Sequence, residues 1–275
     1  MNLLKMVVTG ILIIVITVMC PAVPVIAAPP SKNLPIKGET FTIQGRTAFV
    51  IMPTGKTAGK PIPWVWYAPT LRGLPGGAEK WMFEQFLAKG IAIAGIDVGE
   101  SYGSPKGRAY YTALYKELTG KRGFAKKTSM LARSRGGLML YCWAVENPNA
   151  IACVAGIYPV CNIASYPGIA RACGAYEMTK EQLAANLAKH NPIDRLGLLA
   201  KAKVPLFHIH GDKDRVVPLD ANSAIIASRY KKLGGTMTLE VVKGQGHNMW
   251  QGWFHSQPLV DFVIKHSHEA NIDKK

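Results

Sequence analysis

Short apolar runs and longer segments with helical spacing alternate along most of the chain. The continuous apolar runs, which predict strands, are residues 63–68, 91–96, 128–132, 151–157, 204–209 and 237–242. The segments whose apolar residues recur every three or four positions, and which predict helices, are residues 78–88, 108–118, 136–146, 222–232 and 259–266. Strands that are apolar throughout are buried on both faces, as in a parallel sheet covered by helices on each side. The pattern therefore predicts an α/β fold with a mostly parallel central sheet.

Two segments depart from this alternation. Residues 41–44 and 47–52 alternate between apolar and polar positions around Gly45, which predicts a hairpin and hence an antiparallel edge of the sheet. Residues 158–199 contain Pro, Gly and Cys and one helical stretch at 180–189. We expect this second segment to be a small lid inserted into the domain.

The first residues have the layout of a secretory signal peptide. Lys5 precedes an almost wholly apolar run at residues 6–19, and small residues follow up to Ala28. The apolar run is short for a membrane span, so we favour cleavage near Ala27 or Ala28 over an uncleaved anchor. We therefore expect the signal peptide, residues 1–28, to be removed and the mature protein to be periplasmic or secreted, with no membrane span left.

The rest of the chain is expected to form one domain. We place a linker at residues 29–40, a single α/β domain at 41–268 with its lid at about 158–199, and a tail at 269–275. A chain of 275 residues is long enough for one such domain with a full core.

The composition is strongly basic. The formal net charge is +16 at pH 7, and removal of the signal peptide takes away only Lys5. Such a charge favours anionic surfaces, polyanionic glycans or acidic substrates. The lysines and arginines are dispersed and no nucleic-acid-binding motif is present, so we expect a solvated basic surface and no nucleic-acid partner.

Four cysteines follow the signal peptide, and their spacing forms no Cys-x-x-Cys zinc pattern. Cys142 and Cys153 lie in apolar stretches, which predicts buried free thiols. Cys161 and Cys173 flank a loop segment of the predicted lid, where an exported protein could form a disulfide. The sequence leaves their pairing open.

A serine stands at a strand-to-helix turn in the middle of the sequence. Ser134 follows one predicted strand and precedes a predicted helix, and small residues, Ala132 and Gly136, stand two places to either side. This pattern is close to Gly-x-Ser-x-Gly, the tight turn that exposes a nucleophilic serine and in which larger side chains would clash. Ala132 in place of the first glycine is a mild departure, because a methyl group is still small.

An acid and a base follow this serine along the chain. Asp214 and His247 each lie in a loop directly after a predicted strand. Functional residues gather at the carboxyl ends of parallel strands, so the three side chains can converge there. A serine hydroxyl needs a neighbouring base, and that base needs an acid to orient it. We therefore predict a catalytic triad of Ser134, Asp214 and His247, with Asp212 as the alternative acid.

These motifs resemble those of the α/β-hydrolase superfamily, and more loosely its dienelactone-hydrolase, prolyl-oligopeptidase and acetyl-esterase branches. The acid lies in His-Gly-x-x-Asp-x-x-Val-Pro at residues 210–218 and the base in Gly-x-Gly-His at 244–247. The resemblance covers roughly residues 63–266. It implies the α/β-hydrolase fold, with Asp214 rather than Asp212 as the triad acid.

An oxyanion hole requires two backbone N–H groups close to the nucleophile. One would come from Arg135, the residue that follows the nucleophile. The other would come from the loop after the first apolar strand, where Pro69 has no N–H to donate. We therefore place the second donor at Thr70 or Leu71.

Four residues near predicted strand ends are candidates for substrate binding. Arg135 could stabilise the oxyanion or hold a substrate carboxylate, or it could form a structural salt bridge with Glu100 or Asp97. A Ser-Arg pair at this turn resembles that of glucuronoyl esterases, which act on sugar-acid esters, although the rest of their pattern is not evident. The other candidates are Glu100 and Tyr102, which follow a strand end, and Trp250, which follows the predicted base.

Three further polar residues are predicted to be structural. We favour a structural role for Arg133, which precedes the serine. His208 and His210 point to the same side of a strand, but no carboxylate or cysteine is spaced to complete a metal site. We expect them to form a packed, hydrogen-bonded pair, and we expect neither a metal nor an organic cofactor.

Together these features predict an exported serine hydrolase that cleaves an ester through an acyl-enzyme. The substrate would be a small-molecule or carbohydrate-linked ester, such as an acetylated polysaccharide. Esters are favoured over peptides because we expect no separate N-terminal domain of the kind that prolyl oligopeptidases have. The alternatives are a peptidase or acyltransferase with the same triad, and a catalytically silent protein that binds a glycan or an anionic surface. The oligomeric state does not follow from the sequence.

Overall fold

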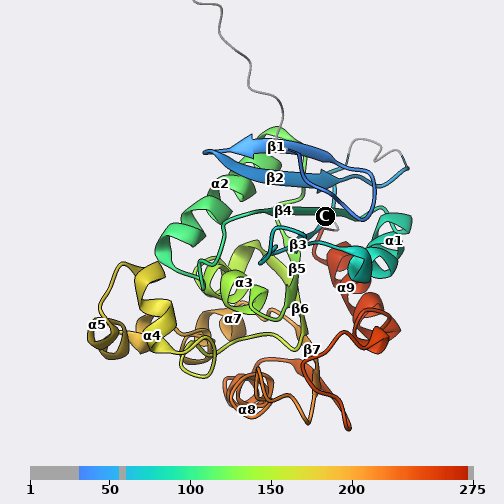
Figure 1. Ribbon diagram of the computed structural model, residues 1–275. Helices are drawn as coiled ribbons and strands as arrows, with labels where there is room; N and C mark the ends of the chain where they lie inside the picture. Colours follow the sequence, from blue (N-terminus) through green and yellow to red (C-terminus); the bar gives the residue numbers. More distant parts are fainter. Residues whose placement is uncertain (1–30, 56–59, 272–275) are drawn as a thin grey trace, which may run out of the picture.

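The computed structural model describes residues 31–55 and 60–271. In this part of the chain eight strands form one sheet, in the spatial order β1-β2-β4-β3-β5-β6-β7-β8 (Figure 1). The strands are β1 (Glu39–Ile43), β2 (Arg46–Ile51), β3 (Trp64–Tyr67), β4 (Ala92–Ile96), β5 (Thr128–Arg133), β6 (Ile151–Ile157), β7 (Leu206–Gly211) and β8 (Met237–Val242). β2 runs antiparallel to β1 and β4, whereas the other neighbouring strands are parallel. The predicted, mostly parallel sheet with an antiparallel hairpin at its edge is confirmed.

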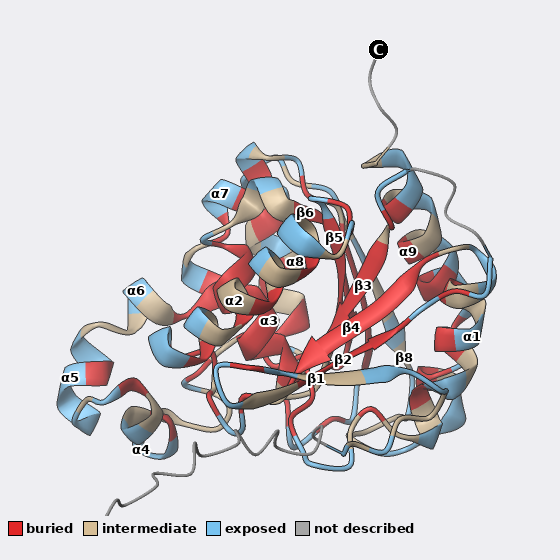
Figure 2. Cartoon of the chain, turned by 90° about the horizontal axis from the view of Figure 1, so that it is seen from above, coloured by how far each residue is buried: buried red, intermediate tan, exposed pale blue. Residues whose placement is uncertain are grey.

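Helices cover both faces of the sheet, as predicted. α2 (Pro105–Lys121), α3 (Gly136–Ala144) and α8 (Ser223–Lys232) lie on one face, and α1 (Lys80–Ala88) and α9 (Gln257–Glu269) on the other (Figure 1). Each face has an apolar core of its own. The central strands β3 and β4 are buried along their whole length (Figure 2). Burial on both faces explains why these strands are apolar at every position.

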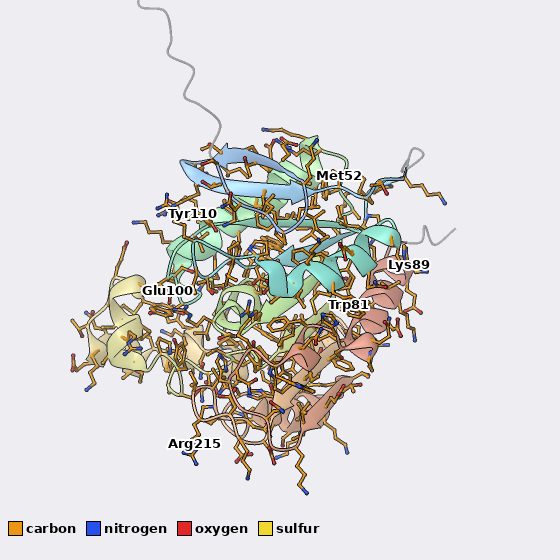
Figure 3. The ribbon with its side chains drawn as sticks, turned by 45° about the vertical axis from the view of Figure 1, so that its right-hand side comes forward. Met52, Trp81, Lys89, Glu100, Tyr110 and Arg215 are labelled. Atoms are coloured by element: carbon orange, nitrogen blue, oxygen red, sulfur yellow. The ribbon has the colours of Figure 1, made fainter. Side chains whose placement is uncertain are left out.

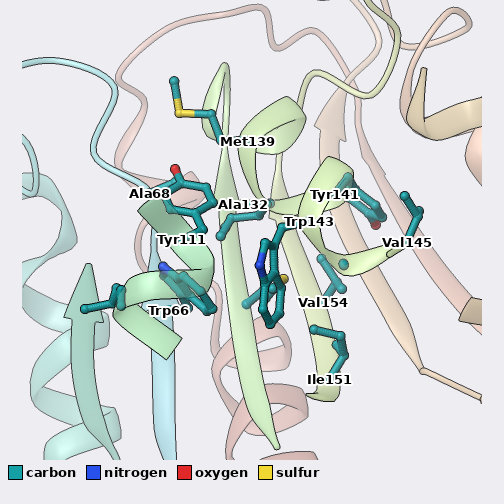
Figure 4. Packing of buried hydrophobic residues seen from close by; sticks show 14 of the residues in the cluster. Trp66, Ala68, Tyr111, Ala132, Met139, Tyr141, Trp143, Val145, Ile151 and Val154 are labelled. Atoms are coloured by element: carbon teal, nitrogen blue, oxygen red, sulfur yellow. The ribbon is translucent and has the colours of Figure 1, made fainter. Parts of the chain in front are cut away.

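Aromatic side chains pack the helices of one face against the sheet. The ring of Trp66 in β3 lies 4.9 Å from that of Trp143 in α3 and 5.3 Å from that of Tyr111 in α2, measured between centroids (Figure 4). All three side chains are almost completely buried. Such aromatic pairs contribute about 0.5–1.5 kcal/mol each beyond the burial of their area. They hold α3, the helix that follows Ser134, in a fixed position over β3 and β5.

The segment between β6 and β7 contains the residues predicted to form an insertion. Its α-helices are α4 (Ile169–Ala172), α5 (Lys180–Ala185), α6 (Leu187–His190) and α7 (Gly197–Lys201). The capping box expected at the start of α5 is present, because the Gln182 N–H donates to Thr179 Oγ1 and the Thr179 N–H to Gln182 Oε1. The single helix predicted at 180–189 is instead divided at Asn186, whose side chain donates to the Gln182 carbonyl and ends α5.

This insertion has a small apolar core that joins it to the domain. Leu183 of α5 and Tyr176 pack with Leu138 of α3. The Tyr176 hydroxyl also donates to the carbonyl of Tyr102, at 2.9 Å, in the loop after β4. Short 3₁₀ turns lie at η1 (Gly77–Glu79), η2 (Pro148–Ala150), η3 (Cys173–Tyr176), η4 (Pro192–Asp194) and η5 (Gln251–Trp253).

The segment before β1, which we expected to be a linker, makes specific contacts with the domain. The Lys32 ammonium lies 2.9 Å from a carboxylate oxygen of Asp97, after β4, and the Lys32 side chain is only 3% exposed. Leu34 and Ile36 pack against the core between the sheet and α1 and α9. An ammonium group so deeply buried requires a paired anion, and Asp97 provides it.

The predicted signal peptide, residues 1–28, lies outside the described residues. Between residues 31 and 271, leaving aside 56–59, no helix is both long and apolar enough to cross a membrane. The four cysteines among the described residues are free thiols. Cys142 and Cys153 are buried, as predicted, and Cys161 is buried too, whereas Cys173 is partly exposed.

The turn into α3 leaves no room for a side chain at Gly137. A Cβ atom there would lie 2.3 Å from the carbonyl oxygen and 2.7 Å from the nitrogen of Val160, both of which are backbone atoms. Gly136, on which the sequence argument placed the steric demand, is less crowded, since its Cβ would lie 3.2 Å from the nearest atom, the Ala68 carbonyl oxygen. The close approach of α3 to the backbone after β6 therefore depends mainly on Gly137.

We predict that Gly137→Ala lowers the free energy of unfolding by about 1–3 kcal/mol, because the backbone of Val160 must move. The matched control is Gly120→Ala in α2, where an added Cβ would meet nothing within 4 Å. This control should stabilise the protein by about 0.5–1 kcal/mol through the higher helix propensity of alanine. Urea unfolding of both variants measures the difference, and equal effects would contradict the steric argument.

Candidate active site

Ser134 occupies a strained turn between β5 and α3. Its φ angle is +47°, in the left-handed region that costs a non-glycine residue of order 1–3 kcal/mol. Three backbone hydrogen bonds hold it there. The Ser134 N–H donates to the Ile157 carbonyl at 3.0 Å, and the Ser134 carbonyl accepts from the N–H groups of Gly137 and Val160, each at 2.9 Å. The turn thus raises the hydroxyl above the end of the strand, as the sequence pattern predicts.

The structure brings Ser134, His247 and Asp214 together. Ser134 Oγ lies 2.9 Å from His247 Nε2, and His247 Nδ1 lies 2.8 Å from Asp214 Oδ2. A carboxylate can only accept, so His247 Nδ1 carries the hydrogen and Nε2 presents its lone pair to the serine hydroxyl. Ser134 therefore donates to His247, in the orientation that a general base requires.

Asp214 is held as an anion by three hydrogen bonds and by a longer contact with His210. Its Oδ1 accepts from the backbone N–H groups of Val216 at 3.0 Å and Val217 at 2.8 Å. Its Oδ2 faces His247 and, at 3.3 Å, Nε2 of His210. Burial alone would raise the pKa of Asp214, but the hydrogen bonds from His210, His247 and Val217 outweigh it and lower this pKa below its usual range.

Asp212, the alternative acid, lies elsewhere. Its Oδ1 accepts from the Gly244 N–H at 2.6 Å, and this hydrogen bond stabilises the loop that carries His247. The geometry therefore selects Asp214 as the partner of His247, in agreement with the choice that the family resemblance implied.

Ser134 and His247 open onto a small cavity of about 140 Å³. Its lining contains three of the residues predicted from sequence to surround the nucleophile, Thr70, Leu71 and Arg135. The other lining residues, which the sequence did not predict, are Leu74, Arg133, Tyr158, Asn248 and Met249. Tyr158 could have been found, because it is the first residue after β6 and thus also follows the carboxyl end of a strand.

Three backbone N–H groups near this cavity are available as donors. Within residues 31–55 and 60–271, the N–H groups of Arg135, Thr70 and Leu71 make no backbone hydrogen bond. Arg135 is the N-cap residue of α3, where the first N–H groups of a helix have no partner inside the helix. These are the positions predicted for the oxyanion hole, and that role remains a prediction.

The two arginines beside Ser134 are each paired with a glutamate. Arg135 Nη1 lies 3.0 Å from Glu100 Oε1, which confirms the salt bridge considered from sequence. Arg133 forms an ion pair with Glu79, whose side chain is only 1% exposed. Glu79 also accepts from the Tyr67 hydroxyl at 2.9 Å. Neither guanidinium therefore presents an unpaired charge to the cavity.

The remaining candidate residues lie around the cavity rather than in it. Trp250 is 41% exposed and is not among the described residues that line the cavity. Behind it, Trp253 is buried, donates to Asn248 Oδ1 at 2.9 Å and packs against Tyr158. Tyr102 has a φ of +46° and packs against the insertion. The predicted contacts of Trp250 and Tyr102 with substrate therefore have no support from the shape of this cavity.

Glu100 lies on the wall of a second cavity of about 230 Å³. Figure 3 shows it near the insertion, with Tyr110 of α2 on the same side of the molecule. The lining residues are Arg46, Val98, Glu100, Ser101, Ser104, Lys106, Gly107, Tyr110, Gly174, Ala175 and Glu177. Arg135 lines the first cavity and Glu100 lines the second, so their ion pair connects the walls of the two cavities. The helical insertion thus borders the second cavity, and of its residues only Tyr158 lines the first.

The fold, together with a serine, a histidine and an aspartate in this arrangement, is that of a serine hydrolase of the α/β-hydrolase superfamily. Within that superfamily, the model of the prolyl oligopeptidase family matches residues 119–259, just over half of the chain. The chain belongs to this family. A comparison with curated protein sequences gives no match.

Solved structures with the same fold include esterases, other hydrolases and peptidases. Est1E from Butyrivibrio proteoclasticus is 19% identical with a TM-score of 0.61, over 85% of this chain and 98% of that one. An S-formylglutathione hydrolase from Agrobacterium tumefaciens is 17% identical with a TM-score of 0.65, over 86% and 98%. The acylaminoacyl peptidase of Pyrococcus horikoshii is 16% identical with a TM-score of 0.65, over 87% of this chain but 42% of that one. Identities this low establish the shared fold alone.

We predict that Asp214→Asn slows the reaction of Ser134 with a fluorophosphonate by about 10³-fold or more, because the amide no longer selects the reactive tautomer of His247. Asp212→Asn is the matched control, since its amide oxygen can still accept from Gly244, and its rate should stay within about twofold of wild type. Intact-mass kinetics, with Ser134→Ala as the blank, measures both rates. A slow Asp212→Asn beside a fast Asp214→Asn would reverse the assignment.

Proposed function

We propose that the protein is an exported carboxylesterase with Ser134 as its nucleophile. The observation that carries this proposal is the hydrogen-bonded row from Ser134 Oγ through His247 to Asp214, at the edge of a cavity. Ser134 attacks the ester carbonyl while its proton passes to His247 Nε2. His247 then gives that proton to the departing alcohol, and Asp214 stabilises the imidazolium in between.

The second half of the reaction uses the same groups. A water molecule gives a proton to His247 and attacks the acyl carbon, and the proton returns to Ser134 Oγ as the acid leaves. The negative charge that develops on the carbonyl oxygen in each half needs two N–H donors. We propose Arg135 as one donor and Thr70 or Leu71 as the other, since all three line the cavity.

The size of the cavity favours a small acyl group. Its volume of about 140 Å³ is well below that of pockets that enclose drug-sized ligands. Leu74, Tyr158 and Met249 supply its apolar walls. Because Glu79 and Glu100 neutralise the two arginines, this cavity favours an uncharged acyl group over one that carries a carboxylate.

The adjacent second cavity suits a polar alcohol. Its walls carry hydroxyl, carboxylate, ammonium and guanidinium groups next to the ring of Tyr110. Such a mixture of hydrogen-bonding groups and an aromatic ring is suited to sugar hydroxyls. We therefore propose a short-chain ester of a carbohydrate, such as an acetylated saccharide, as the substrate class.

We predict that kcat/KM for p-nitrophenyl esters falls by at least about tenfold between butyrate and octanoate, because the longer chain overfills the cavity. Leu74→Ala, which enlarges the cavity, should reduce this ratio. An acetylated monosaccharide should be hydrolysed, and a peptidyl p-nitroanilide should not. Faster turnover of the anilide than of any ester would instead identify a peptidase, and Ser134→Ala provides the blank.

Export is the second part of this proposal. Its support is the layout of residues 1–28, with Lys5, an apolar run and small residues around Ala27. We predict that the protein recovered from the periplasm or medium of an expressing bacterium begins after Ala27 or Ala28, as read by intact mass. A full-length chain that stays with the membrane would show an uncleaved anchor.

A further inference from the structure

Behind Asp214 lies a row of buried polar side chains that the triad does not include. They are Tyr141 of α3 (labelled in Figure 4), His208 and His210 of β7, and Ser223 at the start of α8, and all four are 0% exposed. The distances are 2.6 Å from Tyr141 Oη to His208 Nε2, 2.9 Å from His208 Nδ1 to Ser223 Oγ and 2.7 Å from Ser223 Oγ to His210 Nδ1. The row ends at Asp214 Oδ2, 3.3 Å from His210 Nε2.

The partners of His210 fix which of its nitrogens carries the hydrogen. His210 Nε2 faces the Val217 carbonyl oxygen at 2.8 Å as well as Asp214 Oδ2, and both oxygens can only accept. Nε2 is therefore the donor. Nδ1 then presents its lone pair, so the hydroxyl of Ser223 donates to it. A hydrogen on both nitrogens of His210 would make the Ser223 oxygen the acceptor from Nδ1 and would send the Ser223 hydrogen to His208 Nδ1, which reverses the direction of the row.

The rest of the row follows from the single hydrogen of Ser223. Because that hydrogen goes to His210, the Ser223 oxygen can only accept from His208 Nδ1, which therefore carries a hydrogen. His208 Nε2 is left as an acceptor, and the Tyr141 hydroxyl donates to it. Every donor in the row thus points toward Asp214, and each of the two imidazoles donates from one nitrogen and accepts at the other.

The titratable groups around the row do not disturb this arrangement. Burial lowers the pKa of His208 to about 3 and raises the pKa of Tyr141 well above its usual value, so both are neutral near pH 7. Cys153, Cys161 and Tyr230 surround Tyr141, and burial raises the pKa of each of them. On the other side of Asp214 stand His247 itself and, behind it, Tyr158 with Arg133.

We infer that His210 is a positioning residue for the reaction, and that the row from Tyr141 to Ser223 sets the tautomer in which it acts. The inference rests on the proposed function of Ser134, His247 and Asp214. Asp214 Oδ1 accepts from two backbone N–H groups and Oδ2 from His247, while the N–H of His210, with Nε2 at 3.3 Å from Oδ2, adds a longer contact that restrains the carboxylate from rotating. His247 then always meets the same oxygen.

This sharing also limits how strongly Asp214 attracts the proton on His247. An oxygen that accepts from two imidazoles divides its charge between them. Without the donor from His210, more of that charge acts on His247, and its imidazolium is stabilised. The imidazolium form of His247, which cannot accept the serine proton, is then favoured over the neutral form.

The experiment measures the pH dependence of fluorophosphonate labelling at Ser134 in the full chain. In His210→Phe the acidic limb should move to higher pH by about half to one unit, and the maximal rate should fall about tenfold. In His210→Gln the amide can donate in place of Nε2 and accept from Ser223. The acidic limb should therefore lie close to its wild-type position, and most of the maximal rate should be recovered. Ser223→Ala, which leaves the triad untouched, should shift the limb in the same direction by less.

Tyr230→Phe is the matched control. It also removes a buried hydroxyl, which donates to the Val204 carbonyl at 2.6 Å, but it lies outside the row. It should lower the melting temperature and leave the acidic limb and the rate as in wild type. A limb that stays in place or moves to lower pH in His210→Phe overturns the inference. If that variant does not fold, Ser223→Ala decides by the same criterion, while a wild-type protein that does not label refutes the proposed function as well.

Discussion

The tight turn between β5 and α3 is the constraint on which the site depends. The Ser134 carbonyl accepts from Gly137 at the start of α3 and from Val160 after β6, so one oxygen ties together the helix, the strand end and the next loop. This is possible only because Gly137 has no side chain. The tryptophan and tyrosine rings behind α3 keep the helix in place, and the serine then has no freedom to relax out of its positive φ. The strain is local, and the packing of a whole face of the sheet balances it.

The sequence could predict the sheet and the triad because both rest on simple geometry. Strands that are buried on both faces must be apolar throughout, and parallel strands bring their carboxyl ends to one edge. That rule alone places Ser134, Asp214 and His247 together. The choice between Asp214 and Asp212 needs more, since both lie in one short loop. In the structure the backbone turn at Val216 and Val217 aims the carboxylate of Asp214 at His247, while Asp212 turns toward Gly244.

Pairings across long stretches of sequence could not be predicted in the same way. The pairing of Arg133 with Glu79, and of Lys32 with Asp97, depends on side chains that no local pattern connects. Tryptophan often contacts substrates, which made Trp250 a candidate, but its exposed ring lies outside the cavity. A hydrophobic pattern shows that a side chain will be buried or exposed and says nothing about which way a loop turns it. This is why the core was predictable and the rim of the site was not.

The balance of charge near Ser134 differs from that of the protein as a whole. The chain carries a formal net charge of +16, yet the two arginines next to the nucleophile each have a glutamate partner. An unpaired guanidinium at this point would stabilise a negative charge on any nearby group and would favour anionic ligands over an uncharged ester. Pairing each arginine with a glutamate from a distant part of the chain removes that bias. The backbone N–H groups proposed for the oxyanion hole have the advantage that their direction is set by the fold rather than by a flexible side chain.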